Sequence, residues 1–289
     1  MKPIVAIVAQ GAMGTGLASR LTGHGVTVLT DVSGRSEASR ARARASGMTI
    51  VDREELTSAD IFMSVMPPAE ALPFATIIAP ILAHASRKPL FVDCNAVNPG
   101  TVQSIERVIE SSGASFADVG IIGLPPTPGR PDPKLYAAGE CAERLAVLND
   151  YGLCVRVLEG PVGTASALKM SYGGITKGLL FVSSAMVLAA SRAGVSLPLA
   201  AELAESEPQL LASLSRRIPD MLPKAYRWVA EMQQISDFAA ADPAAAALYG
   251  AAAQFYERMA ADSSSGGPEG ALLGEFAANA LSRLNPPEG

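Results

Sequence analysis

Short β-prone runs alternate with helical patterns over the first half of the chain, and this alternation limits the possible folds more than any other feature. The runs are rich in Val, Ile and Leu, as is typical of strands buried on both faces. Repeated β-α-β units predict a mainly parallel, doubly wound α/β sheet with helices on both faces. The expected strands are residues 3–9, 26–30, 49–51, 61–65, 90–93, 115–120 and 154–158.

The second half has no comparable run and consists of helical patterns. A long helix is expected over residues 163–193, and the Ser- and Gly-rich segment 262–270 is expected to be a loop. We therefore predict an α/β domain over 1–162, an interdomain helix over 163–193 and an all-α domain over 194–289. The shorter helices are expected at residues 199–205, 209–217, 224–238, 243–261 and 270–284.

The composition excludes several classes of protein and partner. The chain is 49% apolar and 18% charged, which excludes a disordered, collagen-like or disulfide-built protein. Its net charge of -5, without long basic runs, argues against nucleic acid as a partner. The uncharged segment 178–191 is shorter than the roughly 20 residues that cross a membrane. We expect no membrane partner, and a location in the cytoplasm because Lys2 precedes a short apolar run rather than a signal peptide.

The apolar excess predicts an assembly. A helix that is apolar nearly all round must be buried on all sides, and one small helical domain does not cover the segment 178–191. A homodimer, in which the helical domains of two copies pack together, would cover it. The 3 cysteines and 2 histidines show no metal-like spacing, so no metal site is expected.

A glycine-rich turn directly follows the first strand and opens a helix. Gly11 and Gly14 fit the second and third glycines of the dinucleotide-binding fingerprint, and Ala9 takes the place of the first. The second glycine lets the backbone approach a diphosphate, and the amides at the helix N-terminus favour its charge. We therefore expect the turn to bind a dinucleotide through Gly11, Ala12, Met13 and Gly14.

The residues after the second strand favour NADP(H) over NAD(H). An NAD enzyme typically has an acidic residue at the strand end, where this chain has Thr30, followed by Asp31. Arg35 and Ser36, with Arg40, are candidates to bind a 2′-phosphate, for which arginine is a planar partner with several donors. The later arginines of the same segment are interpreted as the solvated face of a helix, Arg42 and Arg44.

The order of four motifs resembles that of the β-hydroxyacid dehydrogenases, relatives of 6-phosphogluconate dehydrogenase. The motifs are AQGAMGTGLA at 9–18, SVMPP at 64–68, VDCNAVNPGT at 92–101 and GPVGTASALKMSYGGITKG at 160–178. The sequences GRS at 34–36 and RWVAEMQQI at 227–235 are similar to a branch whose C-terminal domain has no known function. This branch is often described as phosphogluconate dehydrogenase-like.

The resemblance implies a Rossmann domain, a long connecting helix and a helical domain, with hydride transfer at the cleft between the domains. It places the general acid/base at Lys169. The neighbouring residues independently support this role for Lys169. Ala167, Leu168 and Met170 are apolar and would partly desolvate the amine, which favours its neutral form. The alternative is a surface lysine on a helix.

Departures from the family pattern leave the substrate open. The family's carboxylate-binding serine is replaced by Asn95-Ala96, which makes Asn95 a candidate contact to substrate and cofactor. Gly123 retains a family glycine whose backbone binds an anion, although the neighbouring serine is lost. Tyr172 either supplies a hydroxyl or belongs to the core.

Four further residues are candidates on the same grounds. Met66 and Pro67 match the loop that lies near nicotinamide and ribose, or simply end a strand. Lys177 either binds an acid group of the substrate or faces solvent. Arg227 either touches substrate or forms a helix salt bridge with Glu231, beside a core tryptophan.

These features predict an NAD(P)-dependent oxidoreductase that acts on a small polar alcohol or carbonyl. Reduction of a C=N bond is an alternative, which the retained Lys169 disfavours because the related imine reductases commonly replace it. A non-catalytic dinucleotide-binding sensor is a second alternative. Decarboxylation of 6-phosphogluconate is not expected, since Tyr172-Gly173 replaces that enzyme's His-Asn pair.

Overall fold

The computed structural model of the protein describes residues 2–127 and 129–284. The chain divides into two compact units, Met1–Met170 and Ser171–Gly289, and the division falls inside the long helix α5 (Thr164–Arg192). The described strands all lie in the first unit, and the second is helical. The predicted fold class, a doubly wound α/β fold followed by an all-α region, is confirmed.

The described part of the first unit forms one sheet in the order β3-β2-β1-β4-β5-β6-β7-β8. All neighbouring strands are parallel except β6 and β7. Because the strand order reverses between β1 and β4, a ligand is expected outside their carboxyl ends. The strands are β1 (Ile4–Val8), β2 (Thr27–Thr30), β3 (Thr49–Ile50), β4 (Ile61–Ser64), β5 (Leu90–Asp93), β6 (Phe116–Ile122), β7 (Lys134–Ala138) and β8 (Cys154–Val157).

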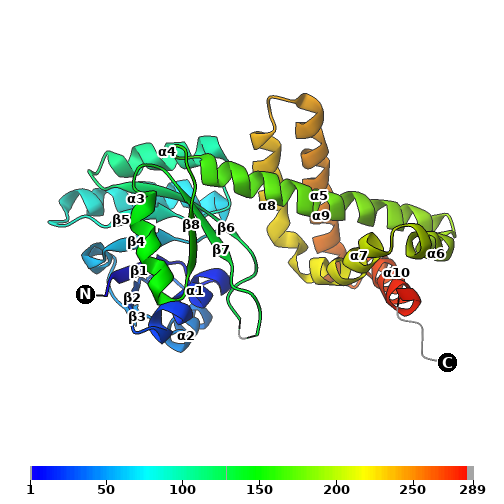
Figure 1. Ribbon diagram of the computed structural model, residues 1–289, viewed down its shortest axis with the longest axis horizontal. Coiled ribbons are helices and arrows are strands. Elements are labelled where there is room, and N and C mark those ends of the chain that lie inside the picture. The colour runs from blue at the N-terminus through cyan, green and yellow to red at the C-terminus, as the bar shows by residue number, and fades with distance from the viewer. Residues whose placement is uncertain (1, 128, 285–289) are drawn as a thin grey trace. The chain divides into compact units, whose positions relative to one another are not determined.

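Helices cover both faces of this sheet, as Figure 1 shows. Alternate residues of β1 belong to separate hydrophobic cores, Val5 and Ile7 on one face and Ala6 and Val8 on the other. The first core includes α1 (Ala12–Gly23), α2 (Glu37–Ala45) and the 3-10 segment η2 (Ala142–Tyr151). The second includes the 3-10 segment η1 (Glu54–Ser58), α3 (Pro68–His84) and α4 (Pro99–Glu110).

Two elements differ from the sequence prediction. Strand β7 was not predicted; it follows a proline-rich segment and pairs antiparallel with β6. The expected loop at 262–270 is largely helical. Helix α9 continues to Ser265, Gly266 ends it with a positive φ of 67°, and Asp262 accepts a hydrogen bond from the Gly270 amide at 2.7 Å. Capping by one carboxylate therefore reduces the loop to a short turn.

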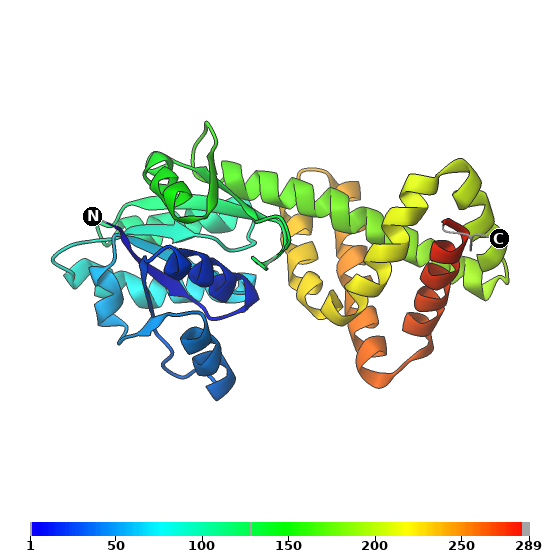
Figure 2. The same cartoon turned by 60° about the horizontal axis from the view of Figure 1, so that its bottom comes forward.

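The second unit is built from helices that pack on the C-terminal part of α5. Helices α8 and α9 run side by side, and α10 packs against α6 and α7 (Figure 2). Phe255, Tyr256 and Met259 of α9 and Phe276 of α10 are buried. The helices are α6 (Ser196–Ser206), α7 (Pro208–Met221), α8 (Ala225–Phe238), α9 (Pro243–Ser265) and α10 (Pro268–Leu284), with a 3-10 turn η3 (Leu222–Lys224).

Glycines in α5 make room for side chains of the second unit. A Cβ added at Gly174 would lie 2.9 Å from the Tyr249 hydroxyl, and one at Gly178 would lie 3.2 Å from the same ring. At Gly173 the nearest atom would be Glu231 Oε1, at 3.2 Å. Each glycine costs about 1 kcal/mol of helix propensity relative to alanine, so close packing is the reason for their presence.

Helix α5 is also apolar. Among the described helices it is one that is long and apolar enough to cross a membrane, judged by length and composition alone. Its most apolar window has a mean hydropathy of 1.5, and 33% of that window is buried within the structure. The helix thus combines a buried face with a large exposed apolar one.

Candidate functional site

The glycine-rich turn leaves the N-terminus of α1 open to a ligand. Gly11 is the N-cap residue, so no side chain caps the helix, and no acidic residue stands in its first turn. A Cβ at Gly11 would meet no atom within 4 Å, whereas one at Gly14 would lie 2.1 Å from the Ala9 carbonyl oxygen. Gly14 therefore permits close packing of helix on strand, and the free amides of the first turn of α1, those of Ala12 and Met13 among them, suit the charge of a diphosphate.

Two side chains link this turn to neighbouring elements. Gln10 donates through Nε2 to Thr30 Oγ1 at 2.6 Å and to the Asp31 carbonyl at 2.9 Å. Arg42 donates through Nε to the Gln10 carbonyl at 2.8 Å. Arg42 is exposed, as expected for the solvated face of the helix, and its guanidinium also holds the turn in place.

The acidic residue after β2 is already engaged. The Asp31 carboxylate accepts hydrogen bonds from the Ser33 amide at 2.7 Å and from Arg53 Nε at 2.9 Å. Arg35 is exposed, and Ser36 is the N-cap of α2, accepting a hydrogen bond from the Ser39 amide. The roles of Arg35 and Ser36 in binding a 2′-phosphate stay predictions.

The ends of β4 and β5 are joined by a buried polar network. Asn95 accepts a hydrogen bond from the Met66 amide at 2.7 Å and donates to Asp93 Oδ2 at 2.6 Å and Ser64 Oγ at 3.1 Å. Pro67 follows as the N-cap of α3. Asn95 is buried and uses both amide hydrogens within the protein, so the structure shows it fixing the Met66 loop; its contact with substrate or cofactor stays a prediction.

This network contains an unusual carboxyl group, Asp93, with no exposed surface. Complete burial raises the pKa of Asp93 from 3.8 to about 7; hydrogen bonds from Asn95 oppose this shift and the nearby Asp118 adds to it. The folded state therefore holds the proton more tightly than the unfolded state between pH 4 and 7. Stability contributed by the protonated group is present at acidic pH and is lost as the pH rises through this range.

Replacing Asp93 by Asn is expected to flatten the dependence of stability on pH, since it removes the group that titrates. The free energy of unfolding, measured by urea denaturation between pH 4 and 8, should fall less steeply for Asp93→Asn than for the wild type. Asp150→Asn, at an exposed position of the same unit, serves as the control. Equal slopes for wild type and Asp93→Asn would contradict the assignment.

Strand β6 holds the beginning of α5, and with it Lys169. Asp118 Oδ2 accepts hydrogen bonds from the amides of Gly163 and Ser166, each at 2.9 Å, and Oδ1 accepts one from Ser166 Oγ at 2.8 Å. A Cβ at Gly120 would lie 3.2 Å from Lys169 Cβ. Asp118 and Gly120 thus fix the half-buried Lys169 against the sheet.

In the second unit Lys177 makes two contacts within the protein that the sequence did not predict. It forms an ion pair with Glu231 and lies over the Trp228 ring, 5.1 Å from its centroid. Its side chain is 16% exposed, so it does not face solvent. Trp228 is half-buried and packs edge-on against the fully buried Tyr256, so it lies at the border of the core rather than inside it.

The remaining candidates of the second unit are more exposed. Arg227 donates through Nε to the hydroxyl of its neighbour Tyr226 at 2.9 Å, and Glu231 pairs with Lys177; the helix salt bridge between Arg227 and Glu231 stays a prediction. Tyr172 is exposed on α5. In the first unit, Gly123 has a φ of 133°, and a Cβ there would lie 2.8 Å from Pro133 Cα. The roles of these three residues toward a substrate stay predictions.

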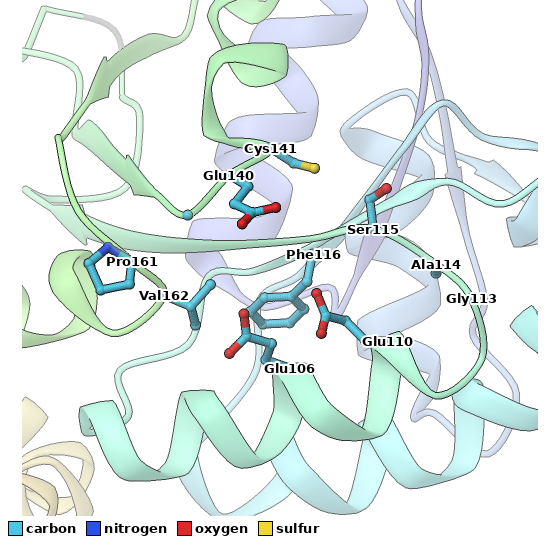
Figure 3. A pocket seen from close by; sticks show the side chains of 11 residues that line it. Glu106, Glu110, Gly113, Ala114, Ser115, Phe116, Glu140, Cys141, Pro161 and Val162 are labelled. Carbon is cyan, nitrogen blue, oxygen red and sulfur yellow. The ribbon is translucent and has the colours of Figure 1, made fainter.

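A separate cavity of about 590 Å³ opens at the opposite edge of the sheet, before β6 and after β7. Figure 3 shows the carboxylates of Glu106, Glu110 and Glu140 around it, with the Cys141 thiol. Burial, with the charge of Glu110, raises the pKa of Glu106. This acidic lining does not suit a diphosphate. Within 2–127 and 129–284, no group of three or more His, Cys, Asp or Glu side chains is arranged to hold a metal ion.

The open helix N-terminus at the switch point of a doubly wound sheet defines a dinucleotide-binding protein. Comparison with protein families agrees. Residues 4–126 match the NAD binding domain of 6-phosphogluconate dehydrogenase, and residues 190–259 match a domain of unknown function, DUF1932.

One known protein of similar sequence and one of similar structure cover 66% and 93% of the chain. An uncharacterized 28.5 kDa protein of Methanothermus fervidus is 30% identical over 193 residues, 66% of this chain and 72% of the relative. The conserved protein MTH1747, described as structurally similar to 3-hydroxyacid dehydrogenases, is 28% identical with a TM-score of 0.71, covering 93% of this chain and 98% of its own.

Two more distant structures show the same fold. The 3-hydroxyisobutyrate dehydrogenase of Mycobacterium tuberculosis has a TM-score of 0.71 at 19% identity, covering 98% and 99% of the two chains. An imine reductase of Myxococcus stipitatus in complex with NADP+ has a TM-score of 0.60 at 18% identity, covering 95% and 99%.

The chain belongs to the β-hydroxyacid dehydrogenase family of 6-phosphogluconate dehydrogenase-like proteins, in the branch with a DUF1932 domain. Its residues 4–126 form an NAD-binding domain of the 6-phosphogluconate dehydrogenase type.

Proposed function

We propose that the protein transfers hydride between NADP(H) and a small polar alcohol or carbonyl compound, with Lys169 as general acid/base. The observation that carries this proposal is the pairing, in one unit, of an open diphosphate-binding turn with a lysine fixed by β6. A sensor that only binds a dinucleotide would need the turn. It would not need Asp118, the buried carboxylate that holds the start of α5.

In this proposal, different residues bind the cofactor and move the proton. The amides at the N-terminus of α1 bind the diphosphate, and the Met66 loop, held by Asn95, lies at the next carboxyl end of the sheet. The nicotinamide, when bound, supplies or accepts the hydride. Lys169, as a neutral amine, takes the hydroxyl proton of an alcohol; as an ammonium group, it returns a proton to a carbonyl oxygen.

The substrate class is tested by a screen of cofactor oxidation and reduction. Hydroxy acids, keto acids, aldehydes and imines are offered with NADPH or NADP+. Turnover of hydroxy or keto compounds supports the proposal. Turnover of imines alone would favour the second candidate, C=N reduction, for which the likeness in fold to an imine reductase is the supporting observation. Tight NADPH binding without turnover of any compound would favour a sensor.

Preference for NADP(H) is tested at Arg35. The Arg35→Ala variant is expected to lose roughly tenfold or more in affinity for NADPH, since an arginine forms strong charge-assisted bonds with a phosphate. Its affinity for NADH, which lacks the 2′-phosphate, should change little. Fluorescence titration measures both dissociation constants. Equal losses for the two cofactors would refute the assignment.

We also propose that the protein acts as a homodimer in the cytoplasm, on a small-molecule substrate and without nucleic acid or membrane partners. Along α5, exposed apolar side chains recur with spacings of three and four residues, the pattern of a helix that packs against another helix. Ile175 is 70% exposed and Met186 is 58% exposed. We call this set the α5 stripe: Tyr172, Ile175, Leu179, Val182 and Met186.

A further inference from the structure

The loop after β2 contains an acidic residue whose charge is compensated inside the protein. Asp31 is 6% exposed, and each of its carboxylate oxygens accepts a hydrogen bond, one from the Ser33 amide and one from Arg53. Burial alone would raise the pKa of Asp31, but the hydrogen bonds of Ser33 and the bond and charge of Arg53 lower it below its usual value. Asp31 is therefore a paired anion.

The last residue of β2 offers a ribose no acceptor either. Thr30 has no exposed surface; its hydroxyl donates to the Ile7 carbonyl at 2.7 Å and accepts from Gln10 Nε2 at 2.6 Å. An NAD enzyme needs an available acceptor near this point for the two ribose hydroxyls. Thr30 and Asp31 are both engaged elsewhere, so the strand end lacks one.

Positive charge is available beside the paired anion. Among the described residues, the side chains of Arg35 and Arg40 form no hydrogen bond or ion pair. Arg40 and Asp31 line a cavity of about 290 Å³, together with two further acids, Asp52 and Glu55. Because two other carboxylates already line this region, an unpaired charge on Asp31 would add to the repulsion of a 2′-phosphate placed beside Arg40.

We propose that Arg53 is a specificity-determining residue: by pairing with Asp31 it withholds that carboxylate from the ribose hydroxyls and removes its repulsion of a 2′-phosphate, so that the loop favours NADP(H). Arg53 acts through Asp31 and is a positioning residue rather than a phosphate ligand. The inference rests on the proposed function, since it requires that the turn at Gly11 binds a dinucleotide.

The Arg53→Gln variant releases an uncompensated carboxylate beside the phosphate position. Repulsion between two like charges a few ångströms apart corresponds to a roughly 10- to 100-fold loss of affinity for NADPH. Affinity for NADH should stay the same or increase, because the freed carboxylate can accept the ribose hydroxyls. Asp31→Asn in the same chain removes the repulsion, so the double variant should bind NADPH within about threefold of the wild type.

The experiment is a double-variant cycle read by fluorescence titration with NADPH and NADH. Arg87→Gln is the matched control, because Arg87 forms an ion pair with Asp60 elsewhere in the same unit. Recovery of NADPH affinity in the double variant supports the inference and also shows that the variant is folded. A double variant as weak as Arg53→Gln would overturn it, since Arg53 would then contact the phosphate directly. A wild type that binds neither cofactor would instead refute the proposed function, and the inference with it.

Discussion

Replacing Lys169 by Met is expected to lower kcat by roughly 10²–10⁴-fold, the usual contribution of a general acid or base. Methionine preserves the length of the side chain but neither accepts nor donates the proton. The hydrogen bonds of Asp118 to Gly163 and Ser166 do not involve the lysine side chain, so the start of α5 should keep its position. The dissociation constant for NADPH should be unchanged.

The measurement is turnover with the substrate found in the screen, beside NADPH titration and circular dichroism. Lys134→Met, at an exposed position of β7, is the control and should turn over as the wild type does. A Lys169→Met protein that folds, binds NADPH and retains normal turnover would refute the role of Lys169. Loss of NADPH binding together with turnover would assign Lys169 to the cofactor instead.

Placing two glutamates in the α5 stripe, Val182→Glu with Met186→Glu, is expected to convert a dimer into a monomer. The stripe carries no charge, and in a two-fold dimer it would face the same stripe of the partner. From Tyr172 to Met186 it extends roughly 21 Å at 1.5 Å per residue. Charges on one copy would face the same charges on the other, at a cost of several kcal/mol.

Sedimentation at micromolar concentration distinguishes the two states. The wild type should sediment as a dimer and the double variant as a monomer with unchanged helix content. Ile77→Glu, which changes an exposed apolar residue of α3, should leave the dimer intact. A wild type that is monomeric at this concentration would overturn the proposed assembly.

Local patterns predicted most of the fold, because each strand and helix is encoded in a few neighbouring residues. The run 90–93 matched β5 at both ends, and the turn at Gly11 was found from its glycines and its place after a strand. Strand β7 was missed because it follows prolines and owes its conformation to pairing with β6. The helical part of the expected loop was missed because it depends on Asp262, whose carboxylate accepts hydrogen bonds from the first amides of α10, and composition alone does not reveal that contact.

The partners of the site residues were largely unpredictable, since they come from distant parts of the chain. Arg53 lies 22 residues from Asp31, and Glu231 lies 54 residues from Lys177. No local pattern links such pairs. Asp118 lies in the expected strand 115–120, but its hydrogen bonds to the start of α5, 45 and 48 residues on, appear only in the folded chain.

The dry setting of Asp93 has a spectroscopic consequence. A carboxyl group that changes charge near neutral pH, away from water, absorbs in the infrared apart from the exposed acids of the chain. Asp93 is joined through Asn95 to the Met66 amide, so any movement of that loop alters the hydrogen bonds on the carboxyl group. The protein therefore contains a built-in vibrational label, which reports the state of the loop without an added probe.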